Sequence, residues 1–546
     1  RVLVLVHFDL DAICSGKILQ SLFHADHILY TLCPVLTHTD LHTTVQNHKE
    51  QVGCIILLNC GGALDLVEFL ELPDNMTVFV ADTHRPLHVC NIYSEHQIRI
   101  LSELDNDEEV PAFGDVFRED DSSDSEDDED EEAGQRFNEA RLEKRRERRL
   151  WEQKRNKMLF DYAQFSYFSG SSATVMFELA WKLSKDSNEL LWLAIVALCS
   201  EQLCCRREPH KLTLSAAAIN THVARLNHAS NANTDTAPAA DAAAADATTH
   251  TISFQKDVQL SLYRHWSLVE SLKHTPYSAT ALKLWTRKGE KRMLELLAEL
   301  GLPLTECRQL FCGMDVNLRS ELPTLLEGKQ KKYGLDELVV PSFSRSHVFH
   351  ARCSARDYAH AALALLEPAQ PDLSHTQAFL NASDGLAGSN LMLRGIEHAK
   401  KQLEAVCSQT QTFLDMNQLI SAGPFLYATV LQGSPLARYF GGGHVIGMLG
   451  RFALAAHVSV SKAKKARSLP LVLTTPDISD PDTWCLVCGV PPVADHSCRN
   501  FFGKAFEKAV DMTQARAEMM FFDSHVMRLN VNDRSKFFDA LISLMS

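Results

Sequence analysis

The stretch VLVLVHFDLDA, residues 2–12, decides the fold, because an apolar run ends there in acidic side chains. The run over residues 2–6 is apolar on both faces, which predicts a fully buried strand in a parallel sheet. Alternation along the chain places Asp9 and Asp11 on one face just beyond that strand. Open parallel sheets bind ligands at the carboxyl ends of their strands, so these two residues are the first candidate site residues.

Two similar runs, over residues 54–58 and 77–80, also end in polar side chains. These side chains are Asn59 after the first run, and Asp82, Thr83 and His84 after the second. Helical stretches separate the three runs and cover residues 13–23 and 63–70. The alternation predicts an α/β fold with a doubly wound parallel sheet. Carboxylates and an imidazole at one edge favour a two-metal hydrolase, whereas a single Asp after a strand is more often a helix cap.

The negative charge of the chain is concentrated in one segment. The 546 residues include 54 Lys and Arg and 69 Asp and Glu, which gives a net charge of −15. Residues 105–132 hold sixteen acidic residues and one basic residue, Arg118, so this segment carries the whole excess. We predict a disordered acidic loop over 105–135. Ser123 and Ser125 lie in it with an acidic residue three positions on, which favours phosphorylation by an acidophilic kinase.

The rest of the chain is close to neutral, and it divides into four further segments. We predict a basic helix and the remaining helical part of the first domain over 136–226, a flexible loop over 227–250, an inserted helical partner-binding domain over 251–384, and a second α/β unit over 385–546. Fifteen scattered cysteines favour a reduced, intracellular protein. No apolar run reaches the roughly 18 residues that would cross a bilayer, so we expect no membrane partner. The chain starts inside a strand-like run, and we expect residues before Arg1.

Two further segments are candidates for contact with nucleic acid. Glycines in the run Gly441–His444, namely Gly442 and Gly443, would let a phosphate approach the backbone beside His444. A basic cluster follows and consists of Lys462, Lys464, Lys465 and Arg467. For this cluster and for the basic helix over 141–157, a functional role in phosphate contact or nuclear import and a merely solvated surface are equally good interpretations.

A third motif has the spacing of a zinc site but not its geometry. Cys485 and Cys488 precede His496 and Cys498. However, the run over 484–490 predicts a buried strand, in which positions three apart point to opposite faces. We therefore expect no metal there.

The strand-end residues resemble the motifs of the DHH phosphoesterase superfamily, which includes the RecJ single-strand exonucleases. Asp9 and Asp11 match two carboxylates of its first motif, and His7 replaces another carboxylate. Asn59 replaces the Asp of the second motif, and in the third Thr83 replaces the middle His between Asp82 and His84. The fourth motif aligns with residues 197–200, where Ser200 stands at the expected Asp and Glu201 follows it. Neutral Asn and Thr cannot replace anionic and imidazole ligands of Mn²⁺ or Mg²⁺, so we expect no metal, no cofactor and no cleavage.

Longer stretches resemble the cell division cycle protein 45 family, a branch of this superfamily. The matching stretches are residues 16–23, 81–86, 175–181, 500–509 and 533–544. The resemblance implies a DHH domain, an inserted helical domain and a DHHA1-like domain over 385–546. It implies a nuclear, non-catalytic subunit of the CMG helicase, acting in the initiation and elongation of DNA replication. The implied partners are the minichromosome maintenance hexamer, the GINS complex, replicative DNA polymerases and single-stranded DNA. The alternative is a divergent metal-dependent exonuclease that uses Asp9, Asp11, Asp82 and His84.

Overall fold

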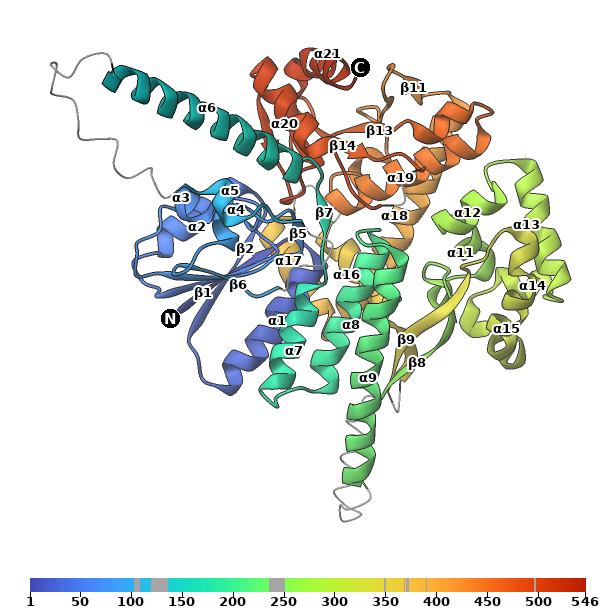
Figure 1. Ribbon diagram of the computed structural model, residues 1–546. Helices are drawn as coiled ribbons and strands as arrows, with labels where there is room; N and C mark the ends of the chain where they lie inside the picture. The colour runs from blue at the N-terminus through green and yellow to red at the C-terminus, as the bar shows by residue number, and fades with distance from the viewer. Residues whose placement is uncertain are drawn as a thin grey trace.

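A computed structural model describes residues 1–102, 109–118, 136–234, 251–347, 350–367, 369, 373–388, 390–494 and 497–546. Three sheets with their helices form three neighbouring units, and the long helix α6 (Arg136–Tyr162) extends away from them (Figure 1).

The first sheet is parallel throughout, with the strand order β2-β1-β3-β4-β6. This order, with helices on both faces, is that of a doubly wound sheet. Its strands are β1 (Val2–His7), β2 (Tyr30–Val35), β3 (Cys54–Leu58), β4 (Thr77–Ala81) and β6 (Ile98–Ile100). A two-stranded ladder joins β5 (His84–Arg85) to β7 (Tyr167–Phe168).

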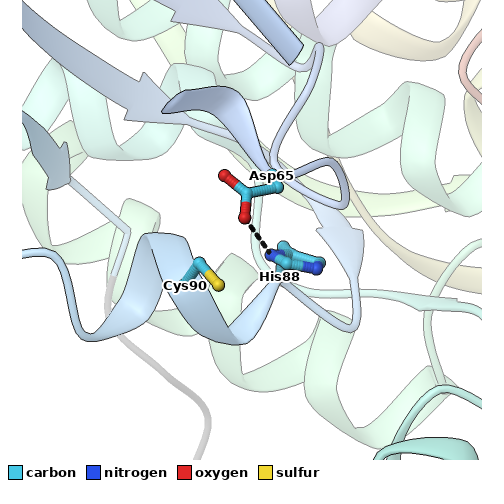
Figure 2. A group of neighbouring side chains, drawn as sticks. All are labelled: Asp65, His88 and Cys90. Carbon is cyan, nitrogen blue, oxygen red and sulfur yellow. Dashed lines mark ion pairs between the residues drawn. The ribbon is translucent and has the colours of Figure 1, made fainter. Parts of the chain in front are cut away.

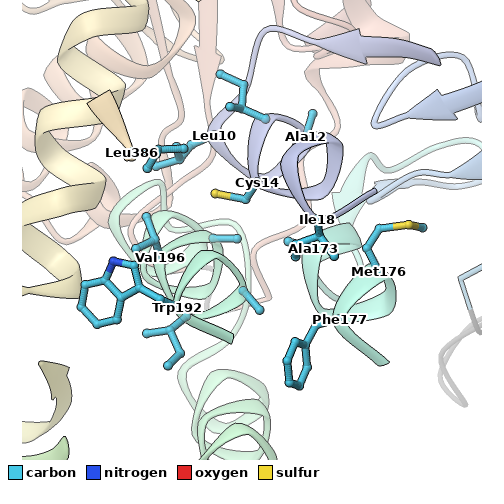
Figure 3. Packing of buried hydrophobic residues seen from close by; sticks show 14 of the residues in the cluster. Leu10, Ala12, Cys14, Ile18, Ala173, Met176, Phe177, Trp192, Val196 and Leu386 are labelled. Carbon is cyan, nitrogen blue, oxygen red and sulfur yellow. The ribbon is translucent and has the colours of Figure 1, made fainter. Parts of the chain in front are cut away.

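Helices cover both faces of this sheet because β1 is apolar on both sides. Leu3 and Leu5 pack on one face with α2 (His38–His48) and α3 (Leu66–Leu70). Val4 and Val6 pack on the other face with α1 (Leu10–Ala25), α7 (Ser172–Lys182) and α8 (Asn188–Leu203), whose buried side chains form one core (Figure 3). The remaining helices of this part are α4 (Val89–Ile92), α5 (Phe113–Val116) and α9 (Pro209–Thr234).

The second unit combines an antiparallel sheet with a helical cluster. The sheet has the order β10-β9-β8, with β8 (Thr251–Val258), β9 (Val339–His347) and β10 (His350–Ser354). The helices enclose a separate apolar core and are α11 (Leu268–His274), α12 (Pro276–Leu282), α13 (Arg287–Glu299), α14 (Leu304–Arg308) and α15 (Val316–Tyr333). Short 3-10 turns lie at Tyr263–His265 and Phe311–Gly313.

The third unit is a mixed sheet of order β11-β12-β13-β14-β16-β15, with helices on both faces. Its strands are β11 (Ile420–Ser421), β12 (Leu426–Thr429), β13 (Leu471–Pro476), β14 (Trp484–Val490), β15 (Ala517–Met519) and β16 (Val526–Asn530). Its helices are α18 (Asn390–Asp415), α19 (Gly443–Val460), α20 (Phe502–Thr513) and α21 (Arg534–Met545). Short 3-10 turns lie at Ala437–Tyr439, Lys464–Ser468 and Val531–Asp533.

The structure differs from the predicted segments in three places. The predicted loop over 227–250 is wrong for residues 227–234, which continue α9, and 235–250 lie outside the described residues. Within the predicted acidic loop, 109–118 are ordered, because Phe113 and Phe117 pack on Tyr93. The stretch 251–384 is not purely helical, and its last helices, α16 (Ala355–Leu366) and α17 (His375–Gly385), join the core of the first sheet.

The expectation that no stretch is long and apolar enough to span a bilayer is wrong for helix α19. Its 18 residues meet that requirement by length and composition, with a mean hydropathy of 1.2. Half of the helix is buried, and it packs on β13 and β14 in the core of the third unit. This core packing accounts for its apolar composition.

Candidate functional site

The carboxyl edge of the first sheet brings the predicted strand-end residues together. Asp9 and Asp11 lie at the turn from β1 into α1, Asn59 follows β3, and Asp82 follows β4. All four side chains are buried. Asn59 adopts a left-handed backbone conformation with φ of 54°, which Asn tolerates, and its amide nitrogen lies 2.8–3.2 Å from the carboxylates of both Asp9 and Asp11.

The Asp9 carboxylate is held by donors from its own chain. One oxygen caps α1 by accepting from Ala12 N at 2.6 Å. The other accepts from the guanidinium of Arg206 at 2.8 Å. Burial disfavours the charged carboxylate, but Arg206 and the neighbouring His7 outweigh it and hold the pKa of Asp9 well below its usual range. Arg206 therefore supplies the positive charge beside Asp9.

Asp11 lies against the N-terminus of α7. Its oxygens accept from Ser172 N at 2.9 Å and from Ala173 N at 3.1 Å, and the hydroxyl of Ser171 donates to one of them. With the amide of Asn59, these donors occupy both oxygens. Burial and the nearby Asp9 raise the pKa of Asp11. Helix N-termini stabilise anions, and here the anion is an aspartate of the same chain.

The third carboxylate belongs to an Asp82–His84–Asp523 arrangement that spans two units. Asp82 accepts from Gly62 N at 2.8 Å and from His84 Nδ1 at 2.7 Å. The other ring nitrogen of His84 lies 3.3 Å from Asp523, between β15 and β16. Burial alone would lower the pKa of His84, but the two carboxylates raise it to about 10. A protonated imidazole thus bridges the first sheet and the third.

The other positions predicted from the motifs bond to groups of the chain itself. The hydroxyl of Thr83 is buried, and the Thr83 carbonyl accepts from Ser169 N at 2.8 Å. Ser200 donates to the Ala197 carbonyl of its own helix at 2.7 Å. Glu201 lies 3.4 Å from Arg207, and burial followed by repulsion from Asp11 raises the pKa of Glu201 to about 8.

A cavity of about 470 Å³ lies between this sheet edge and the third unit. Its volume falls within the range of small-molecule and cofactor sites. Charged and imidazole side chains from both sides line it, including His7, Asp9, His84, Arg206, His444 and Asp523.

The residues at the sheet edge do not fit a pair of divalent ions. Hard cations need free carboxylate or carbonyl oxygens, and the oxygens of Asp9, Asp11 and Asp82 already accept from N–H and O–H donors. Arg206 and the protonated His84 place positive charge where a metal ion would need negative charge.

The predicted glycine–histidine segment is also satisfied from within the chain. Gly442 and Gly443 begin α19, and its first backbone N–H groups, of His444 and Val445, donate to the carboxylate of Glu367 at 2.7 and 3.0 Å. A Cβ at position 442 would lie 2.0 Å from the Glu367 carboxyl carbon, so a larger residue there would have to displace the Glu367 side chain. The Glu367 carboxylate therefore lies where an anion would bind the helix N-terminus.

The remaining candidate residues are dispersed. Lys462, Lys465 and Arg467 are exposed beyond the far end of α19, which lies about 24 Å of helix from His444 at 1.5 Å per residue. Lys464 begins the 3-10 turn there, and Ser123, Ser125 and His496 lie outside the described residues. Cys485 and Cys488 point into different cores on opposite faces of β14, as the alternation predicts.

Sequence reasoning missed Arg206, Glu367 and Asp523. Each comes from a segment far along the chain from the acidic motifs: Arg206 follows α8, Glu367 ends α16, and Asp523 lies in a turn of the third sheet. The one available signal was a charged residue next to an apolar run, as with Glu367 after residues 361–366.

A doubly wound parallel sheet with carboxylates at its carboxyl edge, faced across a cavity by a second α/β unit, defines the class as an α/β protein with a candidate site between two units.

Comparison with known proteins gives the particular family. The profile of the CDC45 family matches residues 2–140 and 114–544. The human "Cell division control protein 45 homolog" is 41% identical over 558 residues, covering 100% of this chain and 97% of the human protein. The Schizosaccharomyces pombe homolog is 27% identical, covering 99% and 95%. The crystal structure of CDC45 from Entamoeba histolytica has a TM-score of 0.70 at 20% identity, covering 100% and 95%. The chain belongs to the CDC45 family, which supports a role in DNA replication and the cell cycle.

Proposed function

We propose that this chain is a non-catalytic subunit of the CMG replicative helicase. In this proposal it acts in the nucleus, joins the minichromosome maintenance ring to the GINS complex, and binds single-stranded DNA. Its family membership and the similarity of its whole length to CDC45 proteins support this role.

The observation that carries the non-catalytic part of the proposal is the saturation of the carboxylates. Two-metal phosphoesterase chemistry needs carboxylates that bridge ions about 3.5–4 Å apart. Here Asp9 pairs with Arg206, Asp11 accepts from the start of α7, and Asp82 pairs with His84. A metal pair would have to displace a buried guanidinium and a protonated imidazole, which costs several kcal/mol.

A nuclease assay tests this part directly. The full chain is incubated with end-labelled single-stranded DNA and Mn²⁺, and products are separated on a denaturing gel. We expect the labelled DNA to keep its full length. Cleavage that is abolished in Asp82→Asn but kept in Asp511→Asn, which alters an exposed aspartate, would establish the exonuclease alternative instead.

Co-purification tests the assembly. The tagged full chain should recover the minichromosome maintenance ring and GINS together from nuclear extract treated with nuclease, so that DNA does not bridge them. Recovery of neither complex would contradict the proposal and leave a free nucleic-acid-binding protein. The helical unit over 251–338, with its own apolar core, is the region we propose for partner contact.

For DNA contact, the structure favours the cluster Lys462, Lys464, Lys465 and Arg467 over the segment Gly442–His444. The former includes exposed cations at Lys462, Lys465 and Arg467, whereas the backbone donors of the latter are paired with Glu367. We propose the acidic tract, with Ser123 and Ser125, as a phosphorylated regulatory loop. Mass spectrometry of the nuclear protein tests this, and two unmodified serines would refute it.

A further inference from the structure

A group of possible metal ligands lies in the loops that follow β3 and β5, separate from the carboxylates of the cleft. Asp65, His88 and Cys90 each offer one donor atom, and the three atoms lie within 4.8 Å of one another. Figure 2 shows the side chains of Asp65 and His88 facing each other, with Cys90 on α4 beside them. All three residues are partly buried.

The three residues come from two loops at the carboxyl ends of neighbouring strands. Asp65 lies in the loop after β3, immediately before α3. His88 and Cys90 lie at the start of α4, in the connection that follows β4 and β5. The His88 backbone N–H donates to the Gly62 carbonyl at 2.9 Å, which fixes one loop against the other. The backbone therefore holds the donors together without requiring contact between the side chains.

The side-chain geometry leaves His88 Nδ1 without a partner, whereas burial and a hydrogen bond to Asp65 raise the pKa of the Cys90 thiol to about 11. One Asp65 oxygen caps α3 by accepting from Glu68 N at 3.3 Å, and the other faces His88. That oxygen and His88 Nδ1 are 3.9 Å apart, which is too long for a hydrogen bond. His88 Nδ1 is buried from water and has no hydrogen-bond partner. An unpaired buried nitrogen is costly, and such groups are normally satisfied by a partner, a water or an ion.

The distances between the three donor atoms suit ligation of one metal ion rather than hydrogen bonds. Ligand atoms that each lie about 2.0–2.3 Å from one tetrahedral zinc ion are themselves roughly 3.3–3.8 Å apart. The observed spacing needs only small side-chain rotations to reach that range. A thiolate, an imidazole and a carboxylate together favour Zn²⁺ over Mg²⁺ or Ca²⁺, which prefer oxygen ligands alone.

We propose that Asp65, His88 and Cys90 bind one zinc ion, with water or a donor from a partner as the fourth ligand. Binding displaces the proton of the Cys90 thiol to solvent, and no redox change is involved. The ion joins the loop after β3 to the start of α4. Gly62 lies in that loop and donates to Asp82, so the ion supports the edge of the cleft without entering it.

Metal analysis of the full chain tests the proposal. The protein is loaded with Zn²⁺, passed through gel filtration and analysed by mass spectrometry, and its affinity is measured against a chelating dye. We expect one zinc per chain. His88→Ala and Cys90→Ala should each weaken binding by more than about 100-fold, since even loss of an outer-shell partner costs 10–100-fold. Asp65→Asn removes the charge but keeps a side chain that can cap α3.

Matched controls separate this site from other thiols and imidazoles. Cys312→Ala and His96→Ala alter exposed residues elsewhere and should leave the affinity unchanged. Loading with Co²⁺ adds a spectroscopic readout, because a thiolate-to-cobalt charge-transfer band should appear and disappear in Cys90→Ala. Absence of bound metal, or binding that survives both His88→Ala and Cys90→Ala, would overturn the proposal.

Discussion

The carboxyl edge of the first sheet and the N-terminus of α19 face the same cavity but attract ligands of opposite charge. The sheet edge holds three buried carboxylates, which attract cations. The helix start presents backbone N–H groups, which attract anions. In this chain Arg206 and His84 neutralise the first, and Glu367 neutralises the second. The comparison shows that side chains of the chain itself pair with both the cation-attracting and the anion-attracting groups of this cleft.

Removing Arg206 should have the largest effect, because it leaves Asp9 buried without its cation. Arg206→Met keeps apolar contact with Phe168, over which the guanidinium lies. We expect the free energy of unfolding to fall by about 3–5 kcal/mol, measured by denaturant titration. The exposed pair Arg148–Glu152 supplies a control, since Arg148→Met should cost about 1 kcal/mol or less. Adding Asp9→Asn to Arg206→Met should recover most of the loss, and a loss below that of the control would contradict the comparison.

His84 should make stability depend on pH in the alkaline range. Its folded pKa of about 10 lies above the ordinary value of 6.5. The charged bridge therefore stabilises the fold fully below about pH 6.5, and this contribution is lost as pH rises through 10. We expect a loss of roughly 5 kcal/mol across that window, at about 1.4 kcal/mol for each pH unit, measured by urea unfolding at several pH values.

His84→Gln should flatten this pH dependence, because glutamine does not titrate. His96→Gln, which alters an exposed histidine, should keep the wild-type profile. Equal pH dependence in wild type and His84→Gln would show that His84 is neutral, and the cation of the sheet edge would then be Arg206 alone.

Replacing Glu367 tests the anionic half of the comparison. Glu367→Gln removes the charge and replaces one of the two acceptors of the His444 and Val445 N–H groups. We expect a loss of about 1–2 kcal/mol in stability. Affinity for single-stranded DNA, measured by fluorescence anisotropy, should rise by about 3–10-fold as the helix start becomes free for phosphate. Weaker binding in Glu367→Gln than in the exposed control Glu397→Gln would show that Glu367 does not compete with DNA.

The sequence predicts one member of each charge pairing at the cleft but not its partner. The apolar runs before Asp9, Asn59 and Asp82 predict the strands and their shared edge, because burial on both faces fixes the strand pattern. The partners Arg206 and Glu367 cannot be predicted this way, since only the packing of α8 and α16 on the first sheet brings them close. Strand β2 was missed for a local reason: it is an edge strand that contains Pro34 and is mostly half-buried, so its pattern is weak.

The two ends of α19 give the smallest expected effect and the sharpest contrast. Its start is paired with Glu367, whereas the exposed cations Lys462, Lys465 and Arg467 lie beyond its other end. If these three contact phosphates, replacing all three by alanine should reduce the slope of log affinity against log salt by about 2, at about 0.7 per contact for a single strand.

The control removes the same charge from the helical unit by replacing Lys288, Lys329 and Lys331, which are also exposed. Both triple variants carry the same net charge, so long-range attraction changes equally and only direct contact distinguishes them. An equal change in salt slope for the two variants would mean that DNA affinity depends on the overall charge of the chain. A change confined to Lys462, Lys465 and Arg467 would place the nucleic acid at the end of α19 that Glu367 does not neutralise.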